Sequence, residues 1–317
     1  MERPKVGRYE KTLVRATFRT LQRINPLTYV YEKIITEKIK ECSNEHYIVS
    51  DGHVHDFFSD GDSSPDHMVD VAYRRGIKIG LGGNHDTTIH WDYYKEAEEK
   101  YPDFVYIPGI EISTTEGDIL AHFPSYDCKN HPAVKYLVSG IKLSAEETID
   151  KIHEAGGIAI APHPNKNRGI GLRKLGKLKD KLDAVEEINI GAGERNILGR
   201  TFSLPSVGNS DAHSKINVGS AVSKLDKEYF KDCYENGKVD RVKFRGKYID
   251  LVRNEKLLIN VAHISSIIPY DTVKSSFEEN IEKTTYWNPF LDILRFTEYF
   301  IDKNKLVARR LEACLKK

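Results

Sequence analysis

DGHVHDFFSDG, residues 51–61, is the stretch from which the fold and the site of this chain are best deduced. The apolar run before it, 47–49, predicts a strand. Residues i and i+2 of an extended segment point the same way, so His53 and His55 would aim both imidazoles at one point. Asp60 follows in a Ser-Asp-Gly turn, which can fold its carboxylate back toward that point. Two imidazoles and a carboxylate directed together predict a metal site.

The same arrangement recurs along the chain. Strand-like runs alternate with helix-like ones from residue 47 onward, and each strand-like run leads to a polar residue able to bind a metal. The alternation predicts a parallel sheet, and strands that all deliver such groups at their carboxyl ends predict a closed barrel with the site at that rim. The expected strands are 47–51, 77–82, 105–110, 118–121, 158–161, 184–190 and 205–208. The candidate metal ligands are His53, His55, Asp60, His85, Glu111, His122, His163, Asp211 and His213.

Composition sets the wider class of protein. The chain has 317 residues, of which 39% are hydrophobic and 30% charged, and its formal net charge of +1 gives no overall signal for polyanion binding. The four cysteines are scattered without a Cys-x-x-Cys motif, which predicts a reduced, cytoplasmic protein. The first residues lack the apolar core of a signal peptide, and no apolar run is long enough to span a bilayer.

Three segments are expected. Residues 1–45 predict a helical N-terminal extension, 46–225 the barrel, and 226–317 a mostly helical C-terminal extension. The last helix, near 288–315, has an apolar stripe too wide for a solvated tail. It would pack on the barrel, on the N-terminal helices or on a second copy of the chain, so a homo-oligomer through the terminal helices is one expectation.

In their order, eight stretches resemble the PHP (polymerase and histidinol phosphatase) family of metal-dependent phosphoesterases. They lie within about residues 47–220 and read DGHVH (51–55), SDG (59–61), NHDT (84–87), GIEIS (109–113), LAHF (120–123), APHP (161–164), EIN (187–189) and NSDAH (209–213). The resemblance implies a distorted, TIM-like (β/α)7 barrel and two or three divalent metal ions, manganese, iron or zinc. One departure is Asn84, which stands where the family often has an aspartate.

The resemblance also implies which residues share each metal. The first metal, at the catalytic position, would be held by His53, His55, Glu111 and Asp211. Glu111 would bridge to a second metal, held also by His122 and His163. The third metal would be held by Asp60, His85 and His213.

The chemistry of such a site can be stated without the family. Two metals bridged by a carboxylate can share a water and lower its pKa from ~15.7 toward ~7. The expected reaction is therefore the hydrolysis of a phosphate ester by a metal-bridged hydroxide. Near the predicted metals, Arg168 in the loop after His163 is the expected contact to substrate phosphate. Arg195, in a glycine-rich turn, is a weaker candidate.

The expected substrate is a small phosphorylated metabolite or a nucleotide. Three alternatives remain open: a nuclease acting on short RNA or DNA ends, a PHP module that binds without catalysing, and an amidohydrolase-type barrel, which also opens with His-x-His. The Ser-Asp-Gly after the two histidines, the glutamate at 111 and the final Asp-x-His argue against the amidohydrolase. Strong salt dependence with a substrate longer than one nucleotide would favour the nuclease.

Overall fold

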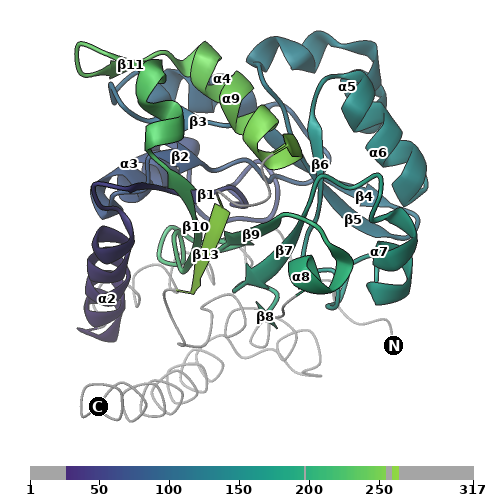
Figure 1. Ribbon diagram of the computed structural model, residues 1–317, viewed down its shortest axis with the longest axis horizontal. Coiled ribbons are helices and arrows are strands. Elements are labelled where there is room, and N and C mark those ends of the chain that lie inside the picture. The colour runs from purple at the N-terminus through teal and green to yellow at the C-terminus, as the bar shows by residue number, and fades with distance from the viewer. Residues whose placement is uncertain (1–25, 196–197, 255–258, 264–317) are drawn as a thin grey trace, which may run out of the picture. The chain divides into compact units, whose positions relative to one another are not determined.

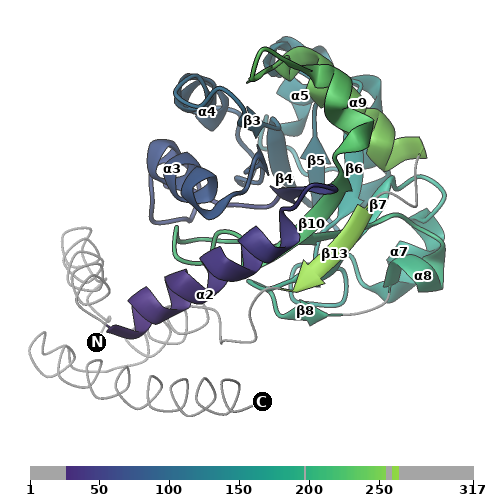
Figure 2. The same ribbon diagram turned by 60° about the vertical axis from the view of Figure 1, so that its left-hand side comes forward.

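The computed structural model describes residues 26–195, 198–254 and 259–263 (Figures 1 and 2). Residues 35–266 form a compact unit of their own. Residues 1–25 of the predicted N-terminal extension and the helix expected near 288–315 lie outside the described residues. The predicted boundary at residue 225 falls inside a strand of the compact unit, and the proposed role of the terminal segments as separate extensions stays a prediction.

The first sheet has five strands, three of them parallel (Figure 1). Its order is β13 (Ile259–His263), β10 (Ala221–Asp226), β1 (Tyr47–Asp51), β2 (Ile79–Gly80) and β3 (Val105–Tyr106). Strands β1, β2 and β3 run parallel, whereas β10 runs antiparallel to both β1 and β13. The carboxyl ends of β1 and β2 therefore open toward the same edge, which places the segments after them side by side.

The second sheet mixes both directions. Its order is β4 (Gly109–Thr114), β5 (Gly117–His122), β6 (Ile158–Ala161), β7 (Ala184–Asn189) and β8 (Glu194–Arg195), with β9 (Ser206–Asn209) also on β7. Strands β6, β7 and β9 are parallel. Strands β4 and β5 form an antiparallel hairpin in which Gly109 is opposite His122, and β5 is antiparallel to β6.

The predicted α/β class is confirmed, but the expectation of a wholly parallel sheet is wrong. The hairpin of β4 and β5 and the pairing of β10 with β1 both break the parallel pattern. Within the described residues, the hydrogen-bonded ladders make these two open sheets and one separate two-stranded hairpin, and no closed barrel. Two isolated parallel bridges connect the sheets, Val54 to Ala212 and His85 to Glu111.

The helices cover the sheets and join their strands. Their bounds are α2 (Pro26–Cys42), α3 (Pro65–Arg75), α4 (His90–Glu98), α5 (Pro132–Leu137), α6 (Ala145–Glu154), α7 (Leu172–Leu178), α8 (Leu198–Phe202) and α9 (Arg241–Asn254). Short 3-10 turns, η1 (Tyr126–Asn130) and η2 (Glu228–Cys233), and the small hairpin β11 (Tyr234–Glu235) and β12 (Lys238–Val239) complete the set. None of the described helices is long and apolar enough to cross a membrane.

Local sequence explains where the helices begin and end. Helix α6 starts with a capping box, in which Ser144 and Glu147 each accept a hydrogen bond from the other's backbone N–H. Helix α3 starts at Ser64-Pro65 and ends at Gly76, whose φ of 97° closes the helix in the left-handed conformation.

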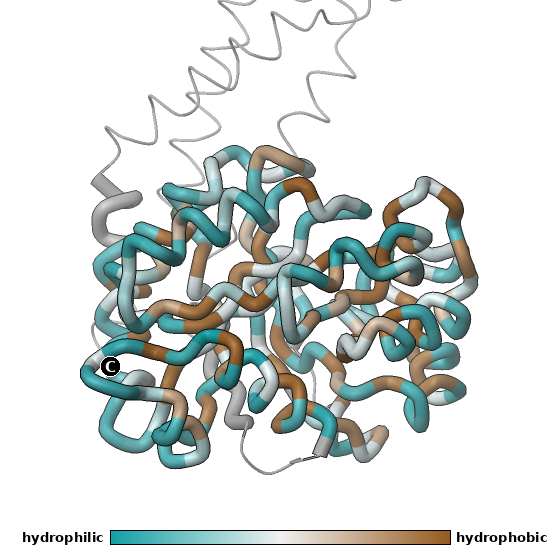
Figure 3. Tube along the Cα trace, turned by 90° about the horizontal axis from the view of Figure 1, so that it is seen from above, coloured by the Kyte–Doolittle hydropathy of each residue, from teal (hydrophilic) through white to brown (hydrophobic). Residues whose placement is uncertain are grey.

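The core lies between the sheets and their helices, and polar and apolar stretches alternate along the trace that encloses it (Figure 3). Helix α9 contributes Phe244, Tyr248 and Val252 to this core. It is held by a buried ion pair between Arg245 and Glu98 of α4, and Arg245 Nε donates to the carbonyl of Tyr106 at 2.8 Å. The described part of the predicted C-terminal extension is thus packed into the compact unit.

Candidate metal centre

The first two candidate ligands lie beside the last two because two segments run together. The chain leaving β1 passes next to the chain leaving β9, where Val54 bridges to Ala212 and the N–H of His55 donates to the carbonyl of Ala212 at 2.8 Å. Side chains at i and i+2 share a side of an extended segment. The alternation therefore directs His53 and His55 toward Asp211.

A second pair of segments meets in the same way. The chain leaving β2 passes next to β4, where His85 bridges to Glu111. The N–H of Glu111 donates to the carbonyl of Asn84 at 3.1 Å, and the N–H of Asp86 donates to the carbonyl of Glu111 at 3.0 Å. This pairing carries His85 and Glu111 to the centre, where the ring Nδ1 of His85 lies 3.2 Å from Glu111 Oε2.

Glu111 is the middle of the arrangement. Its Oε2 lies 3.3 Å from Nε2 of His53 and 3.3 Å from Nε2 of His55. Its Oε1 lies 3.0 Å from Nε2 of His163. Asp211 Oδ1 lies near the same two ring nitrogens, 3.2 Å from His55 Nε2 and 3.6 Å from His53 Nε2. The two oxygens of Glu111 thus face different imidazoles, which is the geometry of a bridging carboxylate.

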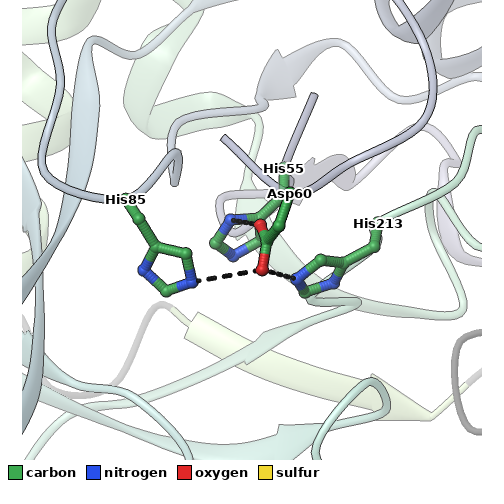
Figure 4. Close-up of side chains that lie close together, drawn as sticks. All are labelled: His55, Asp60, His85 and His213. Atoms are coloured by element: carbon green, nitrogen blue, oxygen red, sulfur yellow. Dashed lines mark ion pairs between the residues drawn. The ribbon is translucent and has the colours of Figure 1, made fainter. Parts of the chain in front are cut away.

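Asp60 forms the outer part of the centre (Figure 4). Its carboxylate oxygens lie 3.3 Å from His55 Nδ1, 3.2 Å from His213 Nε2 and 3.6 Å from His85 Nε2. Figure 4 shows the three rings arranged around this carboxylate. Asp60 is half-exposed, so this part of the centre opens toward solvent, whereas His53 and His55 are fully buried.

Three overlapping groups of side chains bring ligand atoms within 4.8 Å of one another. They are His55, Asp60, His85 and His213; His53, His55 and Asp211; and His85, Glu111 and Asp118. With His163 on Glu111, the structure brings together eight of the nine candidate ligands. Asp118 joins them although the sequence analysis did not select it.

His122 lies apart from these groups. Its Nε2 is 2.7 Å from the carbonyl of Gly52, and its Nδ1 is 3.2 Å from the hydroxyl of Tyr248. The reason is the direction of β5. Because β5 runs antiparallel to β4, its first residues lie across from the carboxyl end of β4, where Asp118 is opposite Ser113, and its last residue lies across from Gly109 at the other end. Asp118 therefore lies at the centre, and His122 contacts Gly52 and Tyr248 outside it.

Glu186 is a second residue that the sequence analysis missed. It is fully buried in β7, and its Oε1 accepts hydrogen bonds from His53 Nδ1 at 2.9 Å and Asn209 Nδ2 at 2.7 Å. Its Oε2 accepts from Asn189 Nδ2 at 2.7 Å and from the N–H of His163 at 3.0 Å. A glutamate among the apolar residues of a predicted strand was the available signal, since buried charges are rare without a partner.

Burial and neighbouring charges shift the pKa values of residues in the centre in opposite directions. Burial lowers the pKa of His85 to about 4, so its ring is neutral near pH 7 and offers a lone pair. Burial raises the pKa of Asp118 to about 6. Burial also opposes ionisation of Glu111, but the nearby charge of His53 and the hydrogen bond from His163 hold its pKa well below the ordinary value. Glu111 is therefore an anion in this setting.

Asn84 stabilises the loop that carries Asp60. Its side-chain Oδ1 accepts hydrogen bonds from the N–H of Asp56 at 2.8 Å and from the hydroxyl of Ser59 at 2.7 Å. An amide at this position accepts both donors without adding another charge to the centre. The departure from the family pattern at Asn84 thus has a structural role here.

Arg168 lies at the edge of the centre. Its Nε is 2.9 Å from Asp118 Oδ2, and its two terminal nitrogens are 3.3 and 3.4 Å from the ring nitrogens of His85. About half of the side chain is exposed, and its φ is 67°. A cation is thus held beside the candidate ligands with part of its surface free for solvent. The side chain of Arg195, the other predicted phosphate contact, lies outside what the structure describes.

The donor set fits divalent metal ions. Asp211 Oδ1 and His163 Nδ1 are buried and make no protein hydrogen bond of good geometry. Nε2 of His53 lies only 3.0 Å from Nε2 of His55, so two ring nitrogens face each other beside two carboxylates. Glu186 accepts a hydrogen bond from the other nitrogen of His53, which leaves Nε2 as the ring atom that would bind a metal ion at the centre. Imidazoles mixed with carboxylates suit manganese, iron and zinc.

Comparison with known proteins gives a partial sequence relative. No family model matches the chain. An uncharacterized protein of Methanocaldococcus jannaschii is 38% identical over 107 residues, which are 34% of this chain and 56% of that protein. The match therefore spans little more than half the length of this curated relative.

Several solved structures are similar to the chain at low identity. A proposed metal-dependent phosphoesterase from Bifidobacterium adolescentis is 20% identical, covers 52% of this chain and 88% of its own, and has a TM-score of 0.42. A two-domain protein from Bacteroides vulgatus with a predicted PHP-like metal-dependent phosphoesterase is 17% identical, with coverages of 69% and 66% and a TM-score of 0.47. The lesion-specific endonuclease PfuEndoQ from Pyrococcus furiosus is 17% identical, with coverages of 57% and 52% and a TM-score of 0.44.

The structures similar to this chain thus include PHP-like metal-dependent phosphoesterases, the family that its motifs resemble. At such identities and TM-scores, the functional assignment rests on the side chains of the centre itself.

Proposed function

We propose that this chain is a PHP-type phosphoesterase that depends on divalent metal ions. The observation that carries the proposal is the convergence of eight candidate imidazole and carboxylate ligands, Glu111 and Asp60 among them, from separate segments of the chain. We also propose that the two sheets belong to one distorted barrel, because the bridges at Val54 and at His85 join them on both sides of the centre.

Two or three ions, manganese, iron or zinc, would be held by overlapping sets. The sets are His53, His55, Glu111 and Asp211; Glu111, Asp118 and His163; and Asp60, His85 and His213, with Asp118 taking the place expected for His122. When bound, such ions neutralise phosphate oxygens and make a water nucleophilic near neutral pH.

The chain's own residues prepare the site for a phosphate. Glu186 orients His53, and Asn84 holds the loop that carries Asp60. Arg168 is placed to donate to a phosphate oxygen, because its guanidinium lies beside His85 and is half-exposed. A planar guanidinium suits a phosphate better than an ammonium does, since two of its N–H groups can donate in parallel.

The expected substrate is a small phosphorylated metabolite or a nucleotide. The test is phosphate release from an aryl phosphate by the purified protein, with manganese and with chelator, beside Asp211→Asn. We expect manganese-dependent release that falls by roughly 100-fold or more in Asp211→Asn, because the ion loses a charged ligand. Asp66→Asn, on the exposed face of α3, is the matched control and should keep wild-type activity.

Circular dichroism and thermal melting would verify that Asp211→Asn is folded. Wild-type turnover by folded Asp211→Asn would contradict the metal assignment. A panel of mononucleotides, oligonucleotides, amides and lactones then separates the phosphomonoesterase from the nuclease and from an amidohydrolase. Oligonucleotide cleavage that weakens steeply with salt would favour the nuclease.

A further inference from the structure

An exposed aromatic cluster has two of its rings on the loop that carries Asp60 and the third on helix α4. It consists of Phe57, Phe58 and Tyr93. The ring centroids of Phe57 and Phe58 are 4.6 Å apart, and those of Phe58 and Tyr93 are 4.7 Å apart. Phe57 is 51% exposed and Tyr93 is 49% exposed. Phe58 lies between them, so the three rings form a continuous apolar surface that water covers only at a free-energy cost.

The backbone around this cluster is fixed to the centre. The N–H of Phe57 donates to the carbonyl of Ser63 at 3.0 Å, and the N–H of Phe58 donates to Asp56 Oδ1 at 2.7 Å. Ser59, the next residue, donates to Asn84, the neighbour of His85. The same loop then places Asp60 among the candidate ligands. The cluster is therefore held in place by the hydrogen bonds that hold the outer ligands.

The distance from the cluster to the centre is limited by the chain. Asp60 is the third residue after Phe57, so their Cα atoms lie at most about 11 Å apart. The ribose and base of a nucleotide extend over a comparable distance from its phosphate. A substrate whose phosphate is bound at the centre can therefore carry a planar ring to Phe57.

We propose that Phe57, backed by Phe58 and Tyr93, stacks on the nucleobase of a nucleoside phosphate whose phosphate is bound beside Arg168. This inference rests on the proposed function and gives its substrate class. Every nucleobase has a flat π-face, and stacking on an aromatic side chain adds affinity without selecting one base. An aliphatic phosphate has no group to place on these rings. The nucleotide is either a free mononucleotide or the terminal nucleotide of a short oligonucleotide, since both present a base and a phosphate.

The test compares two phosphates on one pair of proteins. Wild type and Phe57→Ala are assayed with adenosine monophosphate and with glycerol phosphate under manganese. We expect the KM for the nucleotide to rise roughly 5- to 150-fold more than the KM for glycerol phosphate, with little change in kcat. Phe57→Tyr keeps the aromatic face and should restore the nucleotide KM. Tyr136→Ala, which removes an exposed aromatic ring on α5, is the matched control and should change neither KM.

An equal change in the two KM values would overturn the proposed stacking while leaving the phosphoesterase intact. If wild type releases phosphate from neither substrate, the proposed function fails, and calorimetry with adenosine, which carries no phosphate, decides the stacking alone. Adenosine binding that is lost in Phe57→Ala and kept in Phe57→Tyr supports it, and binding unaffected by Phe57→Ala rejects it. Trinucleotides with a terminal phosphate, assayed beside the mononucleotide, show which of the two sources the site prefers.

Discussion

Glu186 binds one ring nitrogen of His53 and so determines which nitrogen faces the centre. Both of its oxygens are occupied by donors: His53 Nδ1 and Asn209 on one, Asn189 and the His163 N–H on the other. A carboxylate can accept all four hydrogen bonds. The outer partner of a metal-binding histidine sets its tautomer and raises its basicity, so Glu186 prepares Nε2 of His53 for a metal ion.

We predict that Glu186→Gln weakens manganese binding by roughly 10- to 100-fold. The glutamine has the same shape, but its NH2 group would face two donors and leave them unpaired. The measurement is isothermal calorimetry of the metal-free protein with manganese, together with metal content after dialysis. Glu187→Gln is the matched control, because the neighbouring side chain accepts from the N–H of Gly199 instead. Equal manganese affinity in Glu186→Gln and wild type would exclude this orienting role.

Individual ligands could be predicted from the sequence where the spacing is local. His53 and His55 needed only the period-two alternation of an extended segment, and both lie at the centre as expected. Glu186 and Asp118 could not be selected in this way. Their roles depend on which side chains they contact in the folded chain. Glu186 and His53 are 133 residues apart, so no local spacing in the sequence predicts their contact.

At the scale of elements, several strand positions could be predicted and strand directions could not. The expected strand 105–110 was wrong, because the structure divides it between β3 and β4, which lie in different sheets. The run 158–161 coincides with β6, and the run 118–121 lies within β5. The short turn between β4 and β5 makes them a hairpin, whereas the alternation of strands and helices elsewhere suggested parallel strands. Because β5 runs opposite to the expected direction, its first residues lie on the side of the sheet where its last residues were expected. Asp118 therefore lies at the centre, and His122 lies outside it.

The interaction of α9 with α4 can be tested at this scale. We predict that Arg245→Met lowers the free energy of unfolding by about 3–5 kcal/mol, because it removes the buried, hydrogen-bonded ion-pair partner of Glu98 and leaves only the more distant Arg241, whose Nε is 3.7 Å from the carboxylate. The double variant Glu98→Gln/Arg245→Met should recover part of this loss, since no charge then remains unpaired. Urea unfolding measures both. Lys247→Met, on the same helix in a more exposed pair with Asp232, should cost no more than about 1 kcal/mol.

Equal unfolding free energies for Arg245→Met and Lys247→Met would show that the buried pair does not hold α9 in place. A double variant no more stable than Arg245→Met would show that the cost comes from packing around the long arginine side chain and not from the unpaired charge.

At the scale of the whole compact unit, the centre lies where the two sheets meet. One bridge between them is at Val54, between His53 and His55, and the other joins His85 directly to Glu111. Candidate ligands thus stand on both sides of each junction. Metal ions bound there would hold the first sheet to the second. They should therefore stabilise the fold in addition to taking part in the reaction. Ligands of this kind add to stability because they bind the folded chain and not the unfolded one.

We predict that removing metal lowers the Tm by about 5–10 °C. Manganese at about 100 times its Kd contributes about 2.7 kcal/mol, and in a unit of this size each kcal/mol shifts the Tm by about 2–4 °C. The measurement is differential scanning calorimetry of the metal-loaded protein before and after chelation, followed by readdition of manganese. Asp211→Asn should show a much smaller shift, because one set has lost its charged ligand, whereas Asp66→Asn should shift like wild type. A Tm that chelation does not change, in protein shown to have lost its metal, would mean that the sheets are held together without the ions.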